Sequence, residues 1–183
     1  MSIKPVTGAN AVEEAMEAVR SALNDPEQRV FQLIGYQNIG KRNGVRRILE
    51  EEGAKVLWHN YTHIDYAEPI AKKVTTHPQV NHVWEKVYAS NILHPEILDF
   101  FQRLQAGEIT FEGTFILVAN EDEFWGKNMP DLPGVQIKMS VDETLALIEK
   151  NLEKEGAGEM RIENVLANAD RKLRRHYGAG NSR

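Results

Sequence analysis

A glycine-rich segment with a lysine near its end is the part of this sequence best suited to bind a phosphate. Residues Gly35 to Lys41 match the pattern GxxxxGK, in which backbone N–H groups surround a phosphate. An apolar stretch at 29–35 precedes the segment and a helical pattern follows it, so we predict a strand, a turn and a helix in that order. The start of a helix favours anions because its first N–H groups and its dipole both point at the ligand.

Two positions depart from the magnesium-dependent form of this motif. In the full motif a serine or threonine follows the lysine, because its hydroxyl holds Mg²⁺, whereas this chain has Arg42. The apolar strand predicted at 114–119 ends at Asn120, where an NTPase of this kind would place the aspartate that supports the metal. The two departures argue against an ordinary NTPase, and we assign no metal ligands.

A looser anion site is compatible with both departures. The cations near the turn are Lys41, Arg42, Arg46 and Arg47. The alternative is that the glycines only make a turn and the cations are solvated, because short glycine motifs often occur by chance. The predicted ligand-binding residues come from the turn and from the ends of other strands: Gly35, Gln37, Asn38, Gly40, Lys41, Arg42, His59, Asp65 and Asn120.

Histidines and acidic residues follow two of the predicted strands and could move protons. His59, His63 and Asp65 are spaced H-x3-H-x-D, and on a helix the two histidines would share a face that could chelate a metal. The segment follows a strand and is not clearly helical, so a proton-transfer role near neutral pH is the better interpretation. Glu121 lies in an acidic loop that could act as an acid or base, although the simpler interpretation is a solvated surface loop, because surface loops are usually charged. If the protein is an enzyme, we predict transferase or lyase chemistry with His63 or Glu121 as acid or base.

The elements that position these residues follow from hydrophobic periodicity. We predict strands at 29–35, 54–58, 114–119 and 135–139, and the helix between the first two makes a βαβ unit. Helices are predicted from Asn10, after Gly44, three times in succession within 66–106, from Ser140, and near the C-terminus. The expected fold is α/β: three layers, with a mostly parallel sheet of about four strands, a helical insertion after the second strand and a C-terminal helix. We divide the chain into an α/β domain, 1–155, and a linker, amphipathic helix and flexible tail, 156–183.

Composition limits the classes of partner. A net charge of -5 and a pI near 5.7 argue against a general nucleic-acid binder. The basic run near residues 171–176 is explained in part by the dipole at a helix C-terminus. Without cysteine, the 183 residues form no disulfide or thiolate site. No apolar run approaches about 18 residues and no signal peptide is recognisable, so we expect a cytoplasmic protein that does not bind membranes.

The sequence therefore predicts a small-molecule-binding α/β protein. The ligand would be a nucleotide or another phosphorylated, anionic metabolite at the carboxyl ends of the strands, with the cofactor unknown and catalysis unproven. The alternative is a non-catalytic subunit of a larger enzyme assembly that docks through its C-terminal helix. In either case we expect a homo-oligomer or a subunit of a complex.

Overall fold

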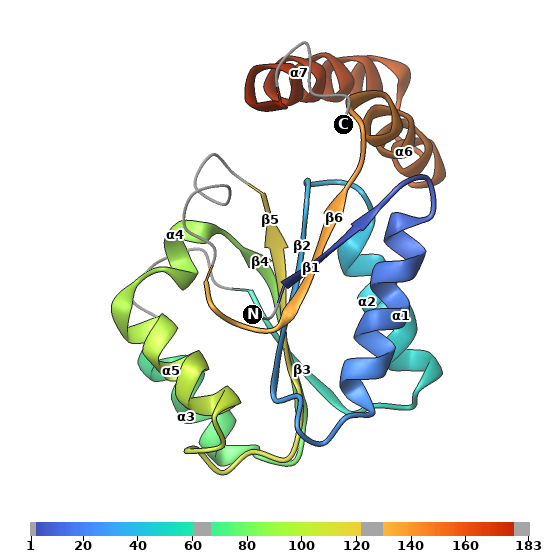
Figure 1. Ribbon diagram of the computed structural model, residues 1–183. Helices are drawn as coiled ribbons and strands as arrows, with labels where there is room; N and C mark the ends of the chain where they lie inside the picture. Colours follow the sequence, from blue (N-terminus) through green and yellow to red (C-terminus); the bar gives the residue numbers. More distant parts are fainter. Residues whose placement is uncertain (1–2, 61–66, 122–129, 178–183) are drawn as a thin grey trace.

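One parallel sheet forms the centre of the protein. The computed structural model describes residues 3–60, 67–121 and 130–177 (Figure 1). Six strands lie in the order β1-β6-β2-β5-β4-β3, and all neighbouring strands run parallel. The strands are β1 (Ile3–Thr7), β2 (Val30–Gly35), β3 (Val56–His59), β4 (Asn81–Val87), β5 (Phe115–Asn120) and β6 (Gly134–Lys138). The central strand β2 is buried along its whole length, as is usual where helices cover both faces of a sheet.

Helices cover both faces and make three layers (Figure 1). One face is covered by α1 (Ala11–Leu23) and α2 (Lys41–Glu51), and the other by α3 (Ala67–Thr76), α4 (Ala89–Ile92) and α5 (Pro95–Gln105). Each face of the sheet has its own hydrophobic core. Neighbouring residues of β5 point to opposite faces: Ile116 packs in the core that includes α1 and α2, and Leu117 packs in the core that includes α3 and α5. The remaining helices, α6 (Val141–Lys154) and α7 (Glu159–Tyr177), pack together beyond the carboxyl ends of the strands.

The α/β class and the parallel sheet are confirmed, but the number of strands is wrong. The sequence predicted about four strands, and the structure has six, because β1 and β4 were not predicted. The edge strand β1 contains Pro5, and proline is tolerated at a sheet edge because its missing N–H costs no ladder hydrogen bond there. The five residues of β1, IKPVT, are too few and too irregular to show the period-2 pattern of a strand.

The predicted run of three helices within 66–106 is also wrong, because β4 lies between α3 and α4. The segment after Pro78 has apolar residues at helical spacing, but its residues from His82 to Glu85 are all buried. A strand buried on both faces loses the period-2 pattern that separates strands from helices. The β-branched and aromatic content of the segment, which includes Val83, Trp84 and Val87, was the signal for a strand.

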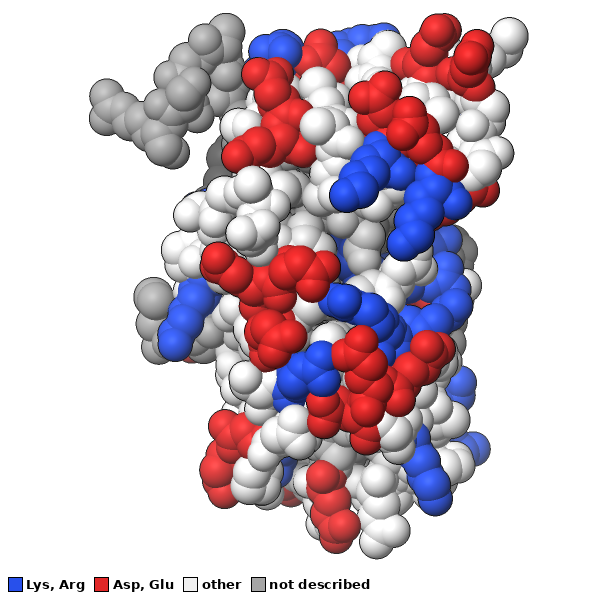
Figure 2. Space-filling view, turned by 90° about the vertical axis from the view of Figure 1, so that its right-hand side faces the viewer, with Lys and Arg blue, Asp and Glu red and all other residues white. Residues whose placement is uncertain are grey.

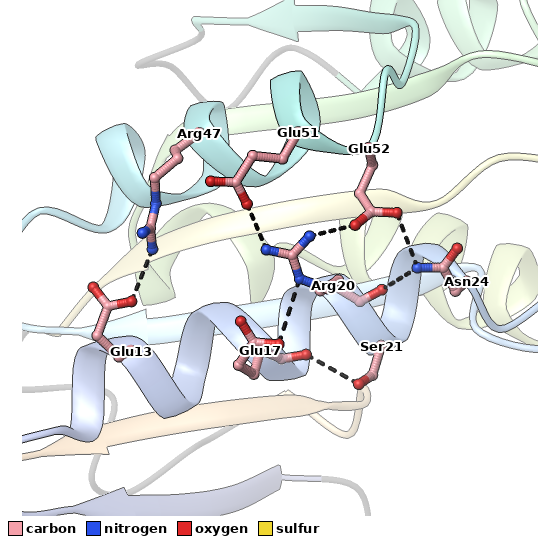
Figure 3. A network of polar contacts seen from close by, with 8 residues as sticks. All are labelled: Glu13, Glu17, Arg20, Ser21, Asn24, Arg47, Glu51 and Glu52. Carbon is pink, nitrogen blue, oxygen red and sulfur yellow. Dashed lines mark hydrogen bonds and ion pairs between the residues drawn. The ribbon is translucent and has the colours of Figure 1, made fainter.

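Ion pairs fasten α2 to α1 on the surface of the domain. Arg20 of α1 pairs with Glu51 and Glu52 at the end of α2, and Arg47 of α2 pairs with Glu13 at 2.9 Å (Figure 3). Lys and Arg alternate with Asp and Glu over this face (Figure 2). These pairs all lie in the C-terminal half of α2 or just after it, and they link that part of the helix to α1.

The two C-terminal helices form a hairpin. A capping box at Ser140 begins α6, as predicted, with the Ser140 hydroxyl accepting from the Glu143 N–H. Residues 155–158 separate α6 from α7, and Ala169 and Leu173 of α7 are buried. The division at residue 155 stays a prediction. Among the described residues, no helix has the length and apolar character needed to cross a membrane.

Candidate functional site

The glycine-rich turn lies between β2 and α2, at the carboxyl edge of the sheet. Gly40 occupies the N-cap of α2 with a left-handed φ of 93°, and Asn38 has a φ of 64°. A Cβ atom at Gly35 would lie 2.9 Å from Ile39 Cδ1, so the turn closes tightly on the end of β2. The helix begins at Lys41, and the prediction that it begins after Gly44 is wrong.

Gly44 instead lies inside α2, where it permits close packing. A Cβ atom at Gly44 would lie 2.4 Å from Met16 Sδ of α1. The three glycines therefore have three uses: a tight strand end, a left-handed helix start and a close helix–helix contact. Local sequence patterns could indicate a turn here but not which helix packs against it.

The lysine of the motif is turned into the protein. Lys41 Nζ donates hydrogen bonds to Gly35 O at 2.8 Å, Tyr36 O at 2.6 Å and Asn120 Oδ1 at 3.0 Å. An ammonium group has three donors, so these three contacts use all of them. Burial lowers the pKa of Lys41 to about 7, and the negative charge of Glu121 opposes that shift. Lys41 therefore links the backbone of the turn to Asn120 at the end of β5.

Arg42 occupies the position after the lysine and pairs with a carboxylate from another strand. Its Nε lies 2.5 Å from Glu85 Oε2 on β4. The side chain of Glu85 is 7% exposed and that of Arg42 is 50% exposed. The pair is therefore asymmetric: the carboxylate is buried and the guanidinium reaches solvent.

The end of β5 lies directly beside the turn. Asn120 is in register with Gly35, and the Glu121 N–H donates to Gly35 O at 3.0 Å. The Glu121 carboxylate accepts a hydrogen bond from Gln136 Nε2 at 3.0 Å. The predicted grouping of Gly35, Lys41 and Asn120 is therefore present in the structure.

A cavity of about 410 Å³ opens over the turn, within the size range of small-molecule sites. Polar and charged side chains from the turn, β4 and α6 surround it. Asn151 of α6 also donates to Asn38 O at 3.2 Å. The lining residues are Gln37, Asn38, Gly40, Lys41, Arg42, Asn43, Glu85, Lys86, Tyr88, Val118, Asn120, Asn151, Leu152 and Glu155. Sequence reasoning named neither Glu85 nor Asn151, because the first was placed on a helix and the second is remote in sequence.

Two of the four cations near the turn point elsewhere. Arg47 pairs with Glu13, and the Arg46 guanidinium lies 5.3 Å from the centre of the Trp58 ring. Only Lys41 and Arg42 of that set line the cavity.

His59 is not brought to the cavity. It is buried in the core beside Phe115, and its Nε2 lies 2.8 Å from His82 Nδ1. His82 Nε2 lies 3.2 Å from the His77 carbonyl oxygen, so we assign the His82 proton to Nε2 and a donating Nε2–H to His59. Burial lowers the pKa of His59 to about 3 and also lowers the pKa of His82.

Two other predicted site residues, His63 and Asp65, lie outside the described residues. Within the described part of the chain, histidine, aspartate and glutamate form no group of three that could hold a metal ion.

Comparison with known proteins identifies the fold but no family. No family model matches the chain, and no curated protein matches it. Among solved structures, 44 chains are similar. One comes from a structure of Drosophila ORC bound to DNA, with 14% sequence identity and a TM-score of 0.50. The match covers 88% of this chain and 49% of the ORC chain, so the chain spans about half the length of that relative. At this identity the likeness concerns the fold alone.

Proposed function

We propose that this chain binds a phosphate-bearing ligand of the nucleotide class at the glycine-rich turn without hydrolysing it. The observation that carries the proposal is the cavity over the first turn of α2, which Arg42 and Lys86 line. In open parallel sheets ligands bind outside the carboxyl ends of the strands, which is where this cavity lies. The first N–H groups of α2 have no partners within the helix, so they are suited to an anion.

The chemistry of the turn favours binding over hydrolysis. The residue after Lys41 carries no hydroxyl for Mg²⁺, and the Lys41 ammonium donates to Gly35, Tyr36 and Asn120. In enzymes that transfer a phosphoryl group, the corresponding lysine contacts the phosphates and the hydroxyl holds the metal. We therefore assign no acid–base step to Glu121.

Thermal shift and calorimetry with ADP, ATP and pyrophosphate test the proposal. Binding should raise the melting temperature, and ATP should not be turned over. The variant Arg42→Ala/Lys86→Ala should lose the stabilisation by ligand. Its matched control is Arg46→Ala/Arg47→Ala, which removes two cations that do not line the cavity and should keep it. Equal stabilisation of both variants would place the ligand elsewhere.

A second candidate function is a non-catalytic subunit of an assembly. Two observations favour it: the fold resembles a chain of DNA-bound ORC, and Met160 of α7 is 77% exposed. Light scattering should then give a mass above 20.8 kDa or show a stable complex with a partner. Deleting residues 157–183 should abolish that association and keep the α/β domain folded. The DNA in the matched structure is bound to ORC. Light scattering of this chain mixed with duplex DNA would test whether it also binds nucleic acid.

A further inference from the structure

The contact between Arg42 and Glu85 lies where a phosphate-binding loop of this pattern would hold its metal. Arg42 replaces the residue whose hydroxyl binds Mg²⁺. Glu85 reaches the same cavity from β4, and its carboxylate lies 2.5 Å from Arg42 Nε. A carboxylate is the side-chain ligand that Mg²⁺ prefers. Here it is already bound to a cation that belongs to the protein.

Because Glu85 is buried, its carboxylate should hold the Arg42 guanidinium tightly. With a side chain that is 7% exposed, Glu85 has lost most of its hydration and needs a permanent counter-charge. Arginine stays charged at every physiological pH, so the counter-charge is always present. A divalent cation at this place would have to displace the guanidinium and would be repelled by it.

The guanidinium also has donors left for a ligand. Arginine has five N–H groups in a planar fork, and one carboxylate accepts at most two of them in parallel. The side chain of Arg42 is 50% exposed and lines the cavity. Its remaining N–H groups can therefore bind phosphate oxygens next to the first N–H groups of α2.

We propose that the Arg42 guanidinium, held by Glu85, replaces the divalent cation of this site, so that a polyphosphate ligand binds here without metal. The inference rests on the proposed function, since it concerns the same cavity. We infer that the ligand is a diphosphate without bound metal, such as pyrophosphate or the diphosphate of a nucleotide. Mg²⁺ should leave binding unchanged or weaken it, because it offsets part of the negative charge that the guanidinium attracts.

Calorimetric titration of the full chain with pyrophosphate, in EDTA and again in excess MgCl₂, separates this inference from the proposed function. Binding in EDTA that Mg²⁺ leaves unchanged or weakens supports both. Binding that needs Mg²⁺ overturns the inference and leaves the proposed function standing. No binding under either condition overturns the proposed function, and the inference with it.

Variants of the pair test the role of the guanidinium. Arg42→Thr restores the hydroxyl of the motif and should weaken binding in EDTA by about 10-fold or more, the loss expected for a charge-assisted pair. Arg42→Lys keeps the charge and the fold but loses the fork, and should weaken binding less. Arg46→Ala, one turn further along α2, should bind as the wild type does. Unchanged affinity in both Arg42 variants would overturn the inference.

Electron paramagnetic resonance of Mn²⁺ gives a readout independent of the ligand. The wild-type protein should bind no Mn²⁺ that depends on Glu85. A bound Mn²⁺ signal that Glu85→Gln removes would show that the carboxylate serves a metal, and would overturn the inference.

Discussion

Removing Arg42 should destabilise the protein more than removing the charge of Glu85, although the two residues form one pair. The asymmetry follows from exposure, since the Glu85 side chain is 7% exposed and that of Arg42 is 50% exposed. In Arg42→Ala the carboxylate stays buried without a partner, whereas in Glu85→Gln the guanidinium can turn to water.

The magnitude can be worked from the same geometry. Breaking a fully buried ion pair costs about 3–5 kcal/mol, and the half-exposed guanidinium reduces this to about 2–3 kcal/mol for Arg42→Ala. Glu85→Gln keeps a polar group of the same shape, so we expect about 0.5–1 kcal/mol. The double variant Arg42→Ala/Glu85→Gln should resemble Glu85→Gln alone, which corresponds to a coupling of about 2–3 kcal/mol.

Urea unfolding of the wild type, the two single variants and the double variant, all at one pH, measures these differences in the free energy of unfolding. Arg46→Ala is the control, because it removes an arginine from the same helix that lies over Trp58, worth about 0.5–1 kcal/mol at an exposed site. If the free energy of unfolding of Arg42→Ala lies within about 0.5 kcal/mol of the wild-type value, Arg42 does not balance a buried charge on Glu85.

Three further predictions concern protons and the backbone. Below about pH 6.5 the unfolded His59 and His82 bind protons that the folded ones resist, so the free energy of unfolding should fall by up to about 1.4 kcal/mol per pH unit for each histidine. His59→Asn should flatten this slope in urea unfolding between pH 7.5 and pH 5, and an unchanged slope would mean that another group causes it. With its pKa near 7, Lys41 should take up a proton when an anion binds at pH 8, because the anion favours the charged form. Calorimetry in buffers of different ionisation enthalpy detects that proton, and equal enthalpies in all buffers would contradict it. Gly40→Ala should cost about 1–2 kcal/mol in urea unfolding, because φ is 93° there and a side chain is strained at that angle. A change near zero would show that the turn can relax.

Local patterns in the sequence were enough to locate the turn. Glycines, an apolar strand and a helical repeat lie within twenty residues, so Gly35, Gly40 and Lys41 could be grouped before any fold was known. Pairing Gly35 with Asn120 required only that both end parallel strands, and the structure has them in register.

The partners of the cations could not be predicted. Glu85 is remote from Arg42 in sequence and lies on β4, a strand whose burial on both faces imitates a helical pattern. Nor did the sequence indicate that Lys41 would point inward, because that depends on the backbone carbonyls of Gly35 and Tyr36. Whether a lysine meets a ligand or the protein depends on the backbone at the turn, which residue types alone do not determine.

Mapping amide chemical shifts in a ¹⁵N-labelled sample during a pyrophosphate titration in EDTA tests the central claim most directly. We predict the largest shifts at the backbone N–H groups of Gly40 to Asn43, where α2 begins beside Arg42. Shifts confined to another part of the molecule, or no shifts at all, would contradict the claim that this turn is the ligand site.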